Sequence, residues 1–61
     1  MSFYRAYIFR GGRMAGQPFT LIAKSDDAAV EEARKLARER GCDIEIFQGK
    51  RLVARIDAPI K

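Results

Sequence analysis

The 61-residue chain holds few side chains with the chemistry of a catalytic or metal-binding site. It has no histidine, so the commonest general base is absent and no Ser-His or Cys-His pair is possible. Its single cysteine, Cys42, can neither close a disulfide within the chain nor build a structural zinc site alone. Asp43 and Glu45 share a predicted strand face with several arginines, which favours ion pairing over acid–base catalysis. We therefore expect no enzymatic activity, no metal and no cofactor.

Aromatic and arginine side chains are the other groups with a recognisable chemistry, because they stack on flat ligands and bury apolar area in interfaces. They alternate along three predicted strands and so fall on one face of a predicted sheet. We call this the open face, because the single predicted helix would cover the opposite one. The residues expected to form an interface there are Phe3, Arg5, Tyr7, Phe9, Phe47, Arg51, Val53 and Arg55.

Three interpretations of the open face compete. Two copies stacked face to face would form a homodimer. The tail or a long loop could instead fold over the face within one chain. A platform for single-stranded nucleic acid would resemble four-stranded RNA-binding sheets. We predict a non-enzymatic protein-interaction module that homodimerises through this face, with nucleic-acid (RNA) binding as the alternative function.

A cationic cluster is predicted at one end of the sheet, where the first turn, the helix C-terminus and the last strand gather. Its members are Arg10, Arg13, Arg38 and Arg40, with Lys61 as a further candidate. This basic pole could bind nucleic acid. The preferred explanation is that Arg38 and Arg40 complement the negative end of the helix. The formal charge of +4 likewise fits an ordinary solvated basic surface better than a polyanion partner.

The first of the elements that would position these residues is a hairpin. Residues 3–10 are rich in aromatic and β-branched types, and Gly11-Gly12 predicts a two-residue turn after them. A second strand then runs to residue 23, in a register that sets Tyr4 opposite Phe19.

A helix is predicted over residues 26–40. Ser25 is a good N-cap, and Gly41 is a good residue to end the helix. One apolar stripe recurs at helical spacing, and it consists of Ala29, Val30, Ala33, Leu36 and Ala37.

A second hairpin is predicted over residues 42–48 and 51–57, which alternate apolar and polar types. Keeping both apolar sets on one face pairs Ile46 with Leu52 and leaves a three-residue loop, Gln48-Gly49-Lys50. Cys42 then belongs to the core face as a small buried side chain.

The predicted fold is α+β of ββαββ type, a four-stranded antiparallel sheet with one helix on one face. A strand–helix–strand crossover is right-handed, and Pro18 in the second strand belongs on a sheet edge. The first strand has the most sheet-favouring composition and belongs in the middle. The strand order 2-1-3-4 meets these conditions with every neighbouring pair antiparallel.

The chain length predicts a single domain, 1–61, with residues 57–61 as a fraying tail. A chain this short buries only roughly 60% of its unfolded surface, so small domains usually need a disulfide, a metal or self-association. The composition offers neither a disulfide within the chain nor a metal site, so self-association is the remaining means of stabilisation. A single cysteine, no signal peptide and no membrane-spanning run predict a cytoplasmic location.

Four short segments resemble a set of short, uncharacterised α-proteobacterial proteins. They are residues 4–7, 26–29, 45–48 and 54–56, with the sequences YRAY, DDAA, EIFQ and ARI. The resemblance covers most of the chain and implies the ββαββ fold. Relatives often have Asp-Gly where this chain has Gly11-Gly12. The resemblance implies no activity, so no functional residue is carried over from it.

Overall fold

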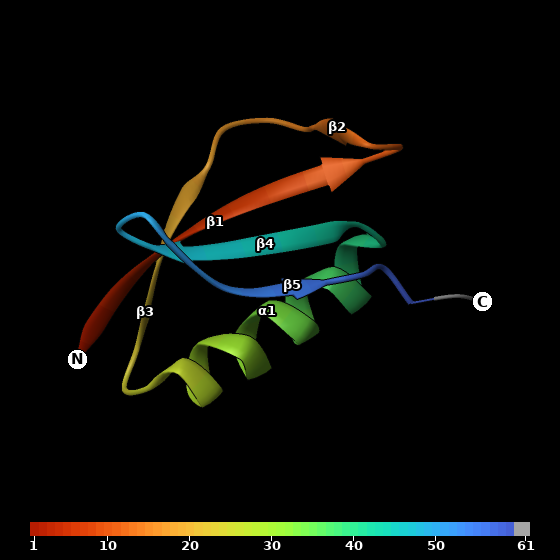
Figure 1. Ribbon diagram of the computed structural model, residues 1–61. Helices are drawn as coiled ribbons and strands as arrows, with labels where there is room; N and C mark the ends of the chain where they lie inside the picture. Colours follow the sequence, from red (N-terminus) through yellow and green to blue (C-terminus); the bar gives the residue numbers. More distant parts are fainter. Residues whose placement is uncertain (60–61) are drawn as a thin grey trace.

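The computed structural model describes residues 1–59, in which an antiparallel sheet carries one helix along one side (Figure 1). The elements are β1 (Ser2–Arg10), β2 (Arg13–Met14), β3 (Phe19–Ala23), α1 (Asp26–Arg40), β4 (Asp43–Gln48) and β5 (Arg51–Ile56). The predicted α+β class, with one helix and an antiparallel sheet, is confirmed.

The sheet has five strands within the described residues, and its detail differs from the prediction. Its order is β2-β1-β4-β5, with β3 also paired to β1 on the side that β2 occupies. The predicted four-strand count is wrong because the predicted second strand is two strands, β2 and β3. Every paired neighbour is antiparallel. The predicted turn holds, with Arg10 opposite Arg13.

The break between β2 and β3 follows from two residues that do not suit a strand. Gly16 adopts a positive φ of 75°, and Pro18 has no N–H to donate to β1. Past the break, Tyr4 lies opposite Leu21 instead of Phe19, so the predicted register is wrong there by two residues. Since side chains alternate with a period of two, this shift leaves each side chain on its predicted face.

The β4–β5 turn is shorter than predicted, because Gln48 pairs directly with Arg51. Only Gly49 and Lys50 lie between the strands, and Gly49 supplies the positive φ (63°) that a two-residue turn with glycine first requires. A shift of one residue in the pairing would turn every side chain of β5 to the opposite face of the sheet. A bulge that leaves Val53 without a partner restores the faces beyond it.

Helix α1 is capped as predicted and packs against the sheet through small side chains. The Ser25 Oγ accepts a hydrogen bond from the Ala28 N–H (3.2 Å), and Gly41 ends the helix in the left-handed conformation. The buried core consists of Tyr4, Ala6, Ile8, Ala23, Ala29, Ala33, Ala37, Cys42, Ile44 and Ile46. The predicted core position of Cys42 is confirmed, since only 1% of the residue is exposed.

Candidate functional site

Apolar side chains on the open face remain accessible to solvent. Phe3 is 67% exposed, and its β3 neighbour Ile22 and the β2 residue Met14 are about half exposed. Tyr7 and Phe47 are half-buried and pack edge to face, with ring centroids 5.5 Å apart. The open face is therefore the candidate site, because large exposed apolar patches are typical of interaction surfaces.

Two shallow hollows meet at the Tyr7–Phe47 pair. Side chains that line the first include Phe3, Arg5, Tyr7, Thr20 and Phe47. Side chains that line the second are Tyr7, Phe9, Glu45, Phe47 and Lys50. The structure therefore brings together five of the eight interface residues predicted from the sequence, all of them on β1 and β4.

Arg51 and Val53 do not belong to the open face, which corrects the prediction. The two-residue turn reverses the faces of these positions relative to the expected three-residue loop. Arg51 reaches toward the helix and donates to the two carboxylate oxygens of Asp26 (3.2 and 3.3 Å) and to Gln48 Oε1 (2.7 Å). Val53 packs against the buried core. Leu52, expected in the core, lies opposite Phe47 and is about half exposed.

The remaining charges of the open face are nearly balanced. Arg55 contacts Glu45 (3.7 Å), which lies directly opposite on β4, and Asp57 (3.4 Å). Within residues 1–59, Arg5 takes part in no ion pair. Asp43, which lies opposite Phe9, accepts a hydrogen bond instead of forming an ion pair.

The described part of the tail stays at one end of the sheet. The Ala58 N–H donates to Asp43 Oδ1 (2.6 Å), so the segment is held at the start of β4. In Figure 1 the chain after β5 leads away from the strands. Residues 57–59 therefore leave Tyr7 and Phe47 uncovered. The rest of the predicted fraying tail, including Lys61, lies outside the described residues.

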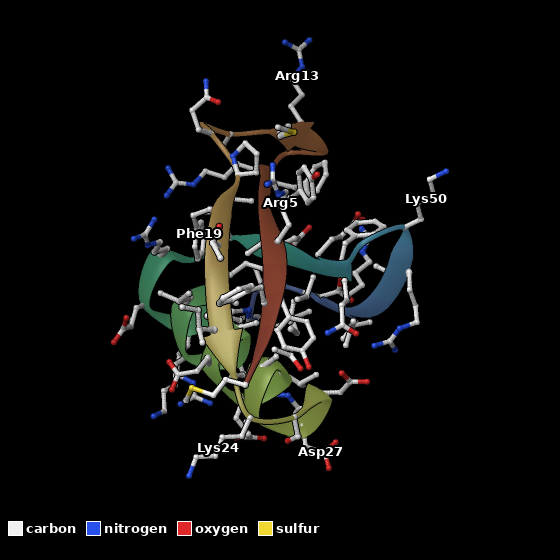
Figure 2. The ribbon with its side chains drawn as sticks, turned by 90° about the vertical axis from the view of Figure 1, so that its left-hand side faces the viewer. Arg5, Arg13, Phe19, Lys24, Asp27 and Lys50 are labelled. Carbon is white, nitrogen blue, oxygen red and sulfur yellow. The ribbon has the colours of Figure 1, made fainter. Side chains whose placement is uncertain are left out.

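The predicted basic pole is only partly assembled. The Arg10 guanidinium donates to the backbone carbonyl of Arg40 (3.5 Å), at the C-terminal end of α1. Arg13 extends away from the sheet beyond the β1–β2 turn (Figure 2). Arg38 lines a separate hollow with Arg34 and residues at the end of β5. These placements fit charges that complement the helix end better than one shared anion site.

A polar cluster centred on Asp26 was missed by the sequence interpretation. The Tyr4 hydroxyl donates to Asp26 Oδ1 (2.7 Å), beside the Arg51 contacts. Hydrogen bonds from Arg51 and then from Tyr4 lower the pKa of Asp26 below its ordinary value of 3.8. The hydrogen bond to Asp26 raises the pKa of Tyr4 above 10.0. The available signal was that a tyrosine on the core face needs a partner for its hydroxyl.

Comparison of the chain with family models, curated proteins and solved structures found no match. The resemblance to short α-proteobacterial proteins stays a prediction. Within residues 1–59, no helix has both the length and the apolar character needed to cross a membrane. No cluster of three or more potential metal-ligating side chains was found in the same range.

Proposed function

We propose that the chain is a non-enzymatic interaction module and that two copies associate through their open faces. The observation that carries this proposal is an exposed aromatic surface without an excess of positive charge. Its strands bear Arg5 and Arg55 against Asp43 and Glu45, and Asp57 adds a further carboxylate beside Arg55. The buried, unpaired Cys42 also fits a reducing compartment such as the cytoplasm.

The size of the surface and its apolar groups fit a small homodimer. A standard interface buries about 800 Å² per partner, roughly one sixth of the 4504 Å² that this chain exposes. Burying a phenylalanine contributes roughly 1.5–3 kcal/mol. Phe3, Met14, Ile22 and Leu52 are about half exposed or more and have the most apolar area left to bury, whereas Tyr7, Phe9 and Phe47 are already partly buried and add less. Summed over two copies, these gains fall within the estimated association cost of about 4–15 kcal/mol.

Single-stranded nucleic acid fits the same surface less well. Such binding combines stacked bases with a cationic groove that follows the phosphates. Here Arg51 faces Asp26 on the helix side, and Arg55 is already in contact with two carboxylates. Arg5 in the first hollow and Lys50 in the second are the cations left beside the aromatic rings in the described residues, so phosphate contacts would be few.

Sedimentation velocity on the wild-type chain and two variants tests the proposal. At about 100 μM, a concentration that fills a dimer of micromolar Kd, we expect the wild type to sediment as a dimer. Phe3→Asp and Phe47→Glu place a charge within the apolar contact and should weaken association about 100-fold or more. Lys24→Asp, an exposed change in the β3–α1 connection, is the control and should leave the dimer intact.

A wild-type chain that is monomeric at this concentration would overturn the proposal. Titration of single-stranded RNA with tyrosine fluorescence as the readout would then decide the alternative. If the RNA quenches tyrosine fluorescence of the wild type but not of Phe47→Glu, the open face is the nucleic-acid-binding surface.

A further inference from the structure

The charges on the open face are separated along the strand direction. Tyr7 and Glu45 form the middle row, with Arg5 two positions to one side on β1. Phe9 and Asp43 form a row two positions to the other side. At about 3.4 Å per residue, each outer row lies roughly 7 Å from the middle. The face thus has a positive end and a negative end, equally far from its centre.

The two outer strand charges, Arg5 and Asp43, have no ionic partner in residues 1–59. Lys50 in the β4–β5 turn has none either, and it lies at the same end of the face as Arg5. Glu45 has Arg55 at 3.7 Å, whereas no ion pair involves Arg5 or Asp43. Asp43 Oδ1 accepts from the Ala58 N–H, and no contact is found for the second oxygen within the described residues. Cations at one end of the face, Arg5 and Lys50, and one anion at the other, Asp43, are therefore available to a second molecule.

A symmetric face-to-face dimer has two limiting geometries, set by the direction of its two-fold axis. With the axis along the strands, each row lies over the same row of the other copy. Arg5 then approaches the partner's Arg5, and like charges meet at both ends. With the axis across the strands, each outer row lies over the opposite outer row, so Arg5 approaches the partner's Phe9 and the partner's Asp43.

We propose that two copies stack with their β1 strands antiparallel, about a two-fold axis through the Tyr7–Glu45 row. This arrangement rests on the proposed homodimer and adds to it the pairing of Arg5 with the partner's Asp43. Unpaired like charges brought together in an interface weaken association, so the charge pattern selects this geometry over the alternative. The two Tyr7 rings meet at the axis. Glu45 and Arg55 each lie over the same residue of the partner, but every Glu45 is neutralised by the Arg55 beside it (3.7 Å), so this row repels less than two unpaired Arg5 side chains would.

A charge-swap experiment tests the pairing. Arg5→Glu faces the new carboxylate with the partner's Asp43, and Asp43→Lys faces Arg5 with the new ammonium. Each single change should raise the dimer Kd about tenfold or more. A chain carrying both changes restores opposite charges across the axis and should return to within about threefold of the wild-type Kd. Arg13→Glu makes the same charge change as Arg5→Glu away from the open face and should have no effect.

Circular dichroism on each variant separates loss of the dimer from loss of the fold, since Asp43→Lys also removes the acceptor of the Ala58 N–H. Recovery in the double variant supports the pairing. If the wild type is a dimer and Arg5→Glu has the same dimer Kd as Arg13→Glu, the antiparallel arrangement is wrong but the proposed homodimer is still supported. A monomeric wild type overturns both.

Discussion

At the scale of single residues, Asp26 is the group on which three parts of the fold converge. It lies in the first turn of α1, where a negative charge complements the helix dipole. It accepts from Tyr4 on β1 and from Arg51 at the start of β5. The carboxylate thus connects the helix to two strands that are distant in the sequence.

The lowered pKa of Asp26 predicts how stability depends on pH. The folded state holds this carboxylate ionised more strongly than the unfolded state, so its contribution is complete above about pH 4 and is lost as the pH falls below that value. Asp26→Asn should therefore lower the denaturation midpoint at pH 7, and its difference from the wild type should shrink by pH 2. The contribution of Tyr4 to stability depends on pH in the opposite direction. Because its pKa is raised, this contribution is present at neutral pH and is lost only as the pH rises above 10.0.

Asp27→Asn is the matched control, since Asp27 is exposed in the same first turn and forms no hydrogen bond or ion pair within the described residues. An equal pH-dependent difference in both variants would mean that the helix dipole, and not the Asp26 cluster, determines the effect.

Cys42 is predicted to be chemically inert in the native state. The residue is 1% exposed and belongs to the core, so a thiol reagent must wait for an opening of the structure. Native labelling at neutral pH should be at least about 100-fold slower than labelling in denaturant. Equal rates in the two states would show that the core is not stably closed at the residue that precedes β4.

At the scale of elements, the helix is held close to the sheet by alanine side chains. Ala29, Ala33 and Ala37 are all at most 1% exposed and recur at one helical turn. Ala33→Leu should therefore cost about 1–3 kcal/mol of unfolding free energy, because the larger side chain forces the layers apart. Leucine and alanine are both strong helix formers, so helix propensity is not the cause.

Chemical denaturation measures this cost, and Glu31→Leu on the exposed side of α1 provides the comparison. Similar midpoints for Ala33→Leu and Glu31→Leu would contradict tight packing between the helix and the sheet.

The elements also show what the sequence could predict. Ser25 and Gly41 are specific local signals, and α1 has the predicted bounds. The faces of β1 and β4 follow from alternation alone, which explains the correct placement of Phe3, Tyr7 and Phe47. Turn length was the weak point, since the sequence around Gly49 is compatible with loops of two or three residues.

That one ambiguity accounts for the errors at Arg51, Leu52 and Val53. The two-residue loop puts Arg51 on the helix side, where it contacts Asp26, and a contact between residues 25 positions apart has no local sequence signal. The interruption at Pro18 was similarly underestimated, because a proline on an edge strand is compatible with either a continuous or a broken strand.

At the scale of the whole molecule, the chain has a small core and a sheet face that residues 1–59 leave uncovered. Five of the ten buried core residues are alanines, and each alanine side chain buries little apolar area. Self-association would therefore contribute directly to stability, and the thermal midpoint should depend on protein concentration. A tenfold increase in concentration should raise Tm by about 5 °C for a dimer of this length.

Calorimetry at several concentrations checks this prediction. Phe3→Asp should unfold at a lower temperature that does not change with concentration. A wild-type Tm that is likewise independent of concentration would mean that the monomer supplies all the stability.

Between β2 and β3 the pairing register with β1 shifts by two residues. This shift has a consequence for how the chain tolerates insertions and deletions. Adding or removing two residues at 15–18 keeps Leu21 and Ala23 turned toward the helix, because the faces of β3 repeat every two residues. Adding or removing one residue turns them to solvent unless a bulge compensates, as it does at Val53. We therefore expect homologous chains to differ in length here by even numbers, and odd differences to occur together with a bulge in β3.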